Sequence, residues 1–180
     1  AHLCVAGAQA GMAGMVRFAG SEALSARVVD RAPEVVASPG RVQAWVIGPG
    51  GGDDVDELIT AALADDVPIV LDASALDHLP KTFNVPALLT PHAGELARML
   101  DTDRDEVEAD PLGHVTKAAE RWNATVLLKG RRTLVATPGR TTRVNLTGSP
   151  WLATAGAGDV LAGLAGSMLA AGADPHDAGS

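Results

Sequence analysis

The sequence predicts an α/β fold in which helices cover both faces of a mostly parallel sheet. Three observations support this prediction. Short apolar runs alternate with stretches of helical periodicity along the chain. Several of these runs end at a glycine, a proline or a charged residue, as strands do at the edge of a sheet. The chain has 180 residues, of which 47% are hydrophobic and only 3% aromatic, and this composition suits one core packed from Ala, Val and Leu.

The expected elements follow from these patterns in chain order. The chain begins with a helix over 3–10, a strand over 15–18 and a helix over 21–31 that Ser21 caps. Further apolar runs predict strands at 44–47, 69–71, 87–89 and 125–128, then a hairpin of 133–136 with 142–144. Further helices are expected over 54–64, 94–100, 115–122 and 160–171. We expect the acidic segment 101–110 to be solvated.

Residues 1–180 are predicted to form a single domain that is truncated at both ends. The chain opens directly in an apolar helix, without an initiator Met, and stops at residues 177–180 as another helix begins.

Composition excludes several classes of partner. A formal net charge of −8 argues against binding of DNA or RNA, whose phosphates need basic surfaces. No apolar run approaches the roughly 20 residues that cross a bilayer, and the first ten residues lack the basic start of a signal peptide. The single cysteine, Cys4, has no internal disulfide partner, which suits a reducing, cytoplasmic location.

Four polar or glycine-rich features each follow a predicted strand. They are the turn Gly48–Gly52, Asp72, His92 and Lys129. In an open α/β sheet, ligands bind at the carboxyl ends of the strands. The sequence therefore predicts a binding site at this edge.

The segment Thr154–Asp159 predicts an anion site at the start of a helix. Gly156 and Gly158 let a ligand approach the backbone closely, and the first amides of the helix have no partner within it. Helix amides and the helix dipole favour phosphate at this position. Asp159 then lies beside a bound anion, where a carboxylate can act as an acid or base. A capping role is the alternative, and we favour catalysis.

Each of the other features also has a simpler interpretation. The turn Gly48–Gly52 is not a dinucleotide fingerprint, because Asp53 stands where the third glycine would be, and it can be a plain strand-to-helix turn. His92 can bind a substrate or merely cap a helix. Zinc is not expected, because no second His or Cys lies at metal-ligand spacing from it. Asp72, with Asp77 nearby, can bind Mg²⁺ through water or cap a helix. The basic run Lys129–Arg132 suits a nucleotide phosphate, but can also be a surface turn.

Several motifs together resemble the ADP/ATP-dependent NAD(P)H-hydrate dehydratases, members of the ribokinase-like superfamily. The resemblance covers essentially the whole chain and is carried by runs in the family's order: VIGPG (46–50), VLDA (70–73), LTPHAGE (89–95), LLKG (127–130), NLTGSP (145–150) and ATAGAGDVLAG (153–163). It implies a three-layer α/β/α ribokinase-like fold with a mostly parallel central sheet.

The resemblance also implies a reaction, which is repair of hydrated nicotinamide cofactors. Such enzymes use ADP or ATP to dehydrate the S epimer of NADHX or NADPHX, and ADP is the expected co-substrate here, with Mg²⁺ as cofactor. Asp159 matches a hydrate-contacting aspartate and would act as the base. Gly50 and His92 match other hydrate-binding positions. Nucleotide-binding positions are matched by Lys129, Gly130, Arg131, Arg132, Thr133, Gly156 and Gly158. No residue is assigned as a metal ligand, and relatives suggest a homo-oligomer, a tetramer or larger.

Some residues depart from the family pattern. Ala155 and Ala157 replace a usual Gly and Thr or Ser, Ser74 replaces a second aspartate, and Trp151–Leu152 replaces a small pair. Two other functions therefore stay open. One is a small-molecule kinase of the same superfamily, acting on a hydroxyethylthiazole or hydroxymethylpyrimidine alcohol. The other is a catalytically silent nucleotide-binding module.

Overall fold

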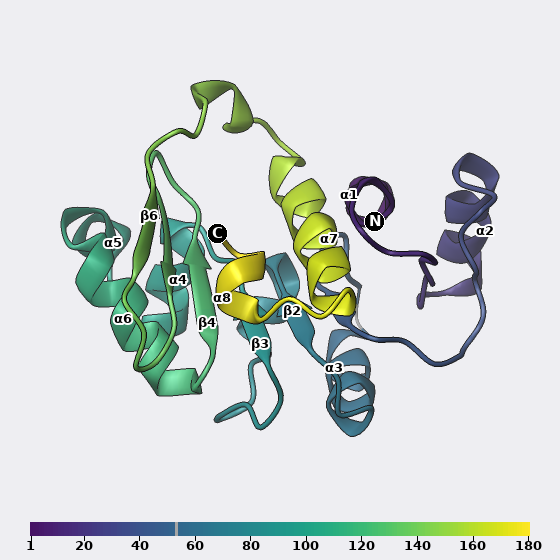
Figure 1. Ribbon diagram of the computed structural model, residues 1–180, viewed down its shortest axis with the longest axis horizontal. Helices are drawn as coiled ribbons and strands as arrows, with labels where there is room; N and C mark the ends of the chain where they lie inside the picture. The colour runs from purple at the N-terminus through teal and green to yellow at the C-terminus, as the bar shows by residue number, and fades with distance from the viewer. Residues whose placement is uncertain (53) are drawn as a thin grey trace.

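The computed structural model describes residues 1–52 and 54–180, so Asp53 of the glycine-rich turn lies outside the described residues. One six-stranded sheet runs through the molecule in chain order (Figure 1). Its strands are β1 (Trp45–Ile47), β2 (Ile69–Leu71), β3 (Ala87–Leu89), β4 (Thr125–Leu128), β5 (Thr133–Ala136) and β6 (Arg143–Asn145). Strands β1 to β4 pair in parallel, while β5 and β6 add an antiparallel hairpin. The predicted mostly parallel sheet is confirmed.

Helices cover both faces of this sheet. The α-helices are α1 (His2–Ala10), α2 (Glu22–Arg31), α3 (Val55–Ala64), α4 (Ala93–Leu100), α5 (Arg104–Ala109), α6 (Pro111–Trp122), α7 (Ala157–Ala170) and α8 (Pro175–Ala178). Two short 3₁₀ turns, η1 (Ala73–Asp77) and η2 (Pro150–Leu152), complete the elements. In the described part of the chain, no helix combines the length and the apolar character that a membrane-spanning segment needs.

Successive side chains of a strand point to opposite faces of the sheet, so the core has two layers. In β2, Ile69 and Leu71 pack into the layer under α3, α4 and α6, whereas Val70 packs into the layer under α7 and α8. All three side chains are fully buried. A parallel strand covered on both faces needs such a continuous apolar run, which is why the short run Ile69–Leu71 identifies a strand.

Helix α7 lies between the sheet and α1 (Figure 1), and α1 packs directly on its backbone. A Cβ added to Gly163 of α7 would overlap the Cys4 carbonyl, and one added to Gly7 of α1 would overlap the Val160 carbonyl. Both helices therefore need glycine where they meet. Val5 of α1 also packs with Val28 of α2 in a small separate cluster.

One expectation about the elements is wrong. Residues 15–18 form no strand and contribute only one isolated bridge, Arg17 to Val36. The acidic segment 101–110 contains α5, whose Val107 is fully buried against the core. Its remaining side chains are mostly exposed, so the expectation that this acidic segment is solvated is confirmed for all but the inner face of α5.

A buried histidine fixes α8 to the sheet. The side chain of His176 is 2% exposed, and its Nδ1 lies 2.8 Å from the hydroxyl of Thr137, which lies 2.8 Å from that of Thr125. Burial lowers the pKa of His176, and the positive charges of Arg140 and Arg143 act in the same direction. The folded protein therefore holds this imidazole neutral.

This histidine should make stability depend on pH. The unfolded chain protonates His176 at a higher pH than the folded chain does. The stabilisation by the buried, neutral imidazole is therefore complete above the ordinary histidine pKa of 6.5. That contribution should be lost as the pH falls through the lowered pKa of the folded state. Urea unfolding between about pH 7.5 and pH 5 would measure it. His176→Gln should flatten this dependence, whereas His2→Gln should leave it in place; an unchanged slope in His176→Gln would contradict the assignment.

Candidate active site

The carboxyl ends of four neighbouring strands bring the expected polar features to one edge of the sheet. Gly48 follows β1, Asp72 follows β2, His92 lies just past β3, and Lys129 follows β4. The parallel pairing of β3 and β4 continues beyond the strands, because the Lys129 N–H donates a hydrogen bond to the Pro91 carbonyl at 2.8 Å. The features identified in the sequence are therefore neighbours in space, as expected for strands that run in parallel.

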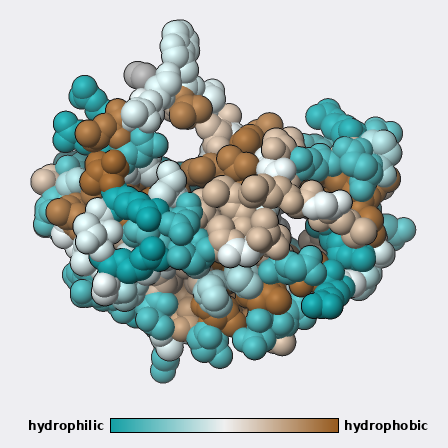
Figure 2. Space-filling model, viewed as in Figure 1, coloured by the Kyte–Doolittle hydropathy of each residue, from teal (hydrophilic) through white to brown (hydrophobic). Residues whose placement is uncertain are grey.

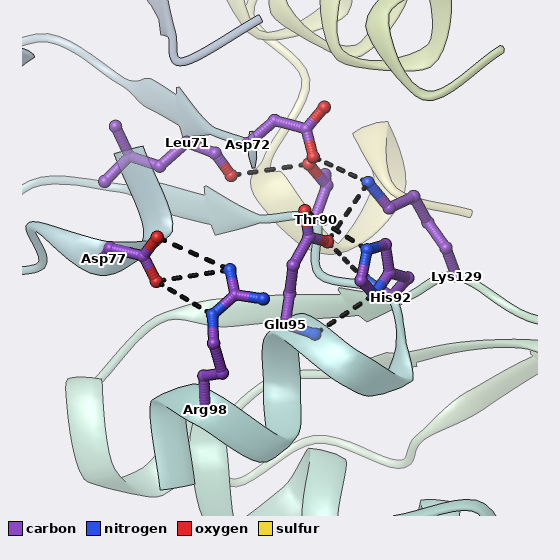
Figure 3. A network of polar contacts seen from close by, with 8 residues as sticks. All are labelled: Leu71, Asp72, Asp77, Thr90, His92, Glu95, Arg98 and Lys129. Carbon is purple, nitrogen blue, oxygen red and sulfur yellow. Dashed lines mark hydrogen bonds and ion pairs between the residues drawn. The ribbon is translucent and has the colours of Figure 1, made fainter. Parts of the chain in front are cut away.

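The centre of this edge is an ammonium group between two carboxylates (Figure 3). The Nζ of Lys129 lies 2.7 Å from Oδ1 of Asp72 and 3.6 Å from Oε2 of Glu95. Asp72 is 2% exposed, the Glu95 side chain 10% and the Lys129 side chain 21%. Two buried carboxylates thus share one cation that still faces solvent, and this network leaves one excess negative charge.

His92 caps α4, as its simpler interpretation proposed. Its Nδ1 accepts a hydrogen bond from the Glu95 N–H at 3.0 Å, and Glu95 Oε2 accepts one from the His92 N–H at 2.7 Å. This reciprocal pair is a capping box. Because Nδ1 accepts, the neutral ring carries its proton on Nε2. The side chain is 56% exposed and its Nε2 lies 3.6 Å from Glu95 Oε1, beyond hydrogen-bond distance, so this N–H can still donate to a ligand.

Glu95 is a site residue that sequence reasoning missed. In the sequence this glutamate stands out only as the last residue of the run LTPHAGE, yet it joins His92 to Lys129. The signal that could have found it is the spacing of His92 and Glu95, three residues apart at a helix start, which is typical of a capping box.

The start of α7 lies against this network. Gly156 has φ +90°, a conformation that favours glycine, and it begins the helix. A Cβ added to Gly158 would lie 3.3 Å from Lys129 Nζ and 3.8 Å from Asp72 Oδ2. The first turn of α7 therefore approaches the lysine ammonium closely, and an anion held by its amides would lie near that charge.

Asp159 follows Gly158 in this first turn and is half-buried. Burial raises the pKa of the Cys4 thiol to about 11, and the charges of Asp159 and Asp72 add to that shift. Two carboxylates thus act on the same thiol from α7 and from the sheet edge. Cys4 stays a protonated, poorly nucleophilic thiol at neutral pH.

The remaining predicted site residues lie around this centre. Gly48 has φ +115°, and an added Cβ there would overlap the Asp72 carbonyl, so the turn after β1 packs directly on the residue that binds Lys129. Gly50 is exposed with φ +68°. Past Lys129, Gly130, Arg131 and Arg132 are exposed on the turn into β5, which begins at Thr133. Among the described residues, these last four form no side-chain hydrogen bond or ion pair with Asp72 or Glu95.

The comparison with protein families decides the identity. The model of the NAD(P)H-hydrate dehydratase family matches residues 1–180. The chain belongs to this family. The family resemblance identified from the motifs is therefore confirmed.

Individual dehydratases and repair enzymes are similar to this chain. It is 44% identical over 185 residues to the bifunctional NAD(P)H-hydrate repair enzyme Nnr of Mycobacterium tuberculosis, covering 96% of this chain and 38% of that protein. It is 43% identical over 149 residues to an ADP-dependent (S)-NAD(P)H-hydrate dehydratase of Neisseria meningitidis, covering 76% of this chain and 50% of that one. The chain thus spans half or less of the length of these relatives.

A solved structure shows the same fold. The ADP/ATP-dependent NAD(P)H-hydrate dehydratase of Bacillus subtilis, co-crystallised with ATP/Mg²⁺ and soaked with CoA, superposes with a TM-score of 0.88 at 30% identity. The match covers 99% of this chain and 72% of that chain. The ribokinase-like α/β/α fold implied by the resemblance is confirmed.

The side chains at this dehydratase-family site do not fit a resident Mg²⁺. A Mg²⁺ ion lies about 2.0–2.1 Å from its carboxylate oxygens, and the space beside Asp72 and Glu95 is taken by the Lys129 ammonium. Asp77, the other acidic candidate, pairs with Arg98 at 3.3 Å (Figure 3). Within residues 1–52 and 54–180, no group of three or more His, Cys, Asp or Glu side chains could hold a metal ion.

Proposed function

We propose that this chain carries a nucleotide-dependent dehydratase site that converts the S epimer of NADHX or NADPHX back to NADH or NADPH. ADP is the proposed co-substrate, and AMP and phosphate are the proposed products. The single observation that carries this proposal is the approach of Gly158 in the first turn of α7 to Lys129, with Asp159 beside it. A lysine ammonium, an anion site and a carboxylate base would then share one edge of the sheet.

The proposed chemistry starts with phosphoryl transfer. Asp159 takes the proton of the hydrate hydroxyl, the hydroxyl oxygen forms a bond to the terminal phosphorus of ADP, and the bond to AMP breaks. The ring nitrogen then donates its electron pair as the C–O bond breaks and phosphate leaves. Loss of a proton from the neighbouring ring carbon restores the dihydronicotinamide. The sum is hydrate plus ADP giving NAD(P)H, AMP and phosphate.

The proposed binding roles follow the same geometry. Free amides at Gly156 and Gly158 would stabilise the transferred phosphoryl group, assisted by the ammonium of Lys129. His92 would donate from Nε2 to the hydrate, and Gly50 would lie against it. Gly130, Arg131, Arg132 and Thr133 would bind the rest of the nucleotide.

The wider setting is part of the proposal. We propose one domain over residues 1–180, a cytoplasmic location supported by the single cysteine, and Mg²⁺ as a companion of the nucleotide. A homo-oligomer, a tetramer or larger, is supported by the exposed apolar side chains of Leu146, Trp151 and Leu152. The segment before α7 that carries them projects from the body of the molecule (Figure 2). Light scattering coupled to size exclusion would test that state.

The decisive experiment mixes S-NADHX, Mg²⁺ and either ADP or ATP with this chain and with the full-length gene product. Recovery of reduced-nicotinamide absorbance, with AMP released from ADP, would support the dehydratase. A stable phosphate ester of a thiazole or pyrimidine alcohol, with no recovery of NADH, would instead indicate the kinase. Nucleotide binding without turnover of either substrate by the full-length gene product would indicate a silent binding module.

A further inference from the structure

The ammonium of Lys129 occupies the position that a metal ion would need. It lies 2.7 Å from Oδ1 of Asp72, the residue after β2, and 3.6 Å from Oε2 of Glu95, in the first turn of α4 (Figure 3). A divalent ion shared by these two carboxylates would lie within about 2.0–2.6 Å of their oxygens. The ion and the ammonium cannot occupy this space together.

Burial explains why a counter-ion is always needed here. Asp72 is 2% exposed, and an ionised carboxylate without a partner at such a position is strongly destabilised. In this chain the partner is the ammonium of Lys129, the residue after β4, whose N–H donates to the Pro91 carbonyl. The cation is therefore part of the fold and needs no recruitment from solution.

We propose that the Lys129 ammonium takes the place of a resident divalent cation, with Asp72 and Glu95 acting as the residues that position it. A divalent ion used in catalysis would then have to arrive bound to the nucleotide phosphates, a consequence that rests on the proposed function. The proposal about Lys129 itself does not, and its test uses neither nucleotide nor hydrate.

Mn²⁺ titration followed by electron paramagnetic resonance tests the proposal with the metal alone. The wild-type chain should show only weak, non-stoichiometric binding. Lys129→Met should expose both carboxylates and bind one Mn²⁺ at least about tenfold more tightly, because one repelling charge within 4 Å has been removed. Mn²⁺ should also raise the thermal midpoint of that variant. Lys129→Arg, which keeps the charge, should resemble wild type.

Two controls locate the new site. Adding Asp72→Asn to Lys129→Met should abolish the gained affinity, whereas Lys81→Met, at an exposed lysine, should change nothing. Stoichiometric Mn²⁺ binding by the wild-type chain that Asp72→Asn removes would overturn the proposal. So would a well-folded Lys129→Met variant that gains no affinity. If Lys129→Met does not fold, the wild-type titration with its Asp72→Asn comparison still decides.

Discussion

Replacement of Asp159 by Asn is expected to lower kcat for hydrate dehydration by about 10²–10⁴-fold, the contribution typical of a positioned general base. The amide keeps the size of the side chain in the first turn of α7 but cannot take the hydroxyl proton. Nucleotide affinity should change little, because the proposed phosphate contacts come from the amides of α7 and from Lys129. Initial rates of NADH recovery and calorimetric ADP binding would separate the two effects.

A second carboxylate at a helix start provides the matched control. Asp103 precedes α5 and is exposed, so Asp103→Asn removes one negative charge from a helix N-terminus away from the sheet edge. Its activity should stay near wild type. If Asp159→Asn lost ADP binding but kept kcat, Asp159 would be a binding residue, and the proposed base would have to be another group.

Gly48→Ala should strongly destabilise the protein and weaken nucleotide binding. The residue has φ +115°, and the added methyl group would overlap the backbone carbonyl of Asp72. Left-handed strain of about 1–2 kcal/mol and overpacking of about 1–3 kcal/mol should lower the free energy of unfolding by about 2–5 kcal/mol. Any relaxation moves Asp72, and with it the ammonium that Asp72 holds. Urea unfolding and ADP titration would measure both consequences.

Gly172→Ala separates strain from overlap. Gly172 has φ +98°, close to that of Gly48, but an added Cβ there meets no atom of the described chain within 4 Å. We expect a loss of only about 1–2 kcal/mol from left-handed strain, without an effect on ADP binding. Equal destabilisation by the two substitutions would mean that the contact between the β1 turn and Asp72 contributes nothing.

The central strands could be predicted because their sequence signal is local and strong. Runs such as Ile69–Leu71 and Ala87–Leu89 are apolar throughout and end at a polar or proline-containing turn. The run at 15–18 is apolar except for Arg17, but Met15 is 61% exposed and no neighbouring strand of the described chain pairs with the run beyond one bridge. Strand formation depends on a pairing partner, which a single-sequence pattern does not specify.

The edge of the sheet could be predicted as a site, but its internal pairing could not. Asp72 and Lys129 are 57 positions apart, and their ion pair depends on the adjacency of β2, β3 and β4. Glu95 was missed for another reason. A glutamate at the start of a helix is usually solvated, and only the capping box turns this side chain toward His92 and Lys129.

The close contact of α1 with α7 has a consequence for how the chain folds during synthesis. The sheet order follows the chain order, so each strand can join a neighbour that has already been made. Helix α1 is different, because the backbone on which its glycine packs is translated on the order of 10 s later at ordinary ribosome speeds. Until then the face of α1 that packs on α7 has no native partner. A chaperone that shields short apolar helices on the ribosome would therefore benefit this segment more than any strand of the sheet.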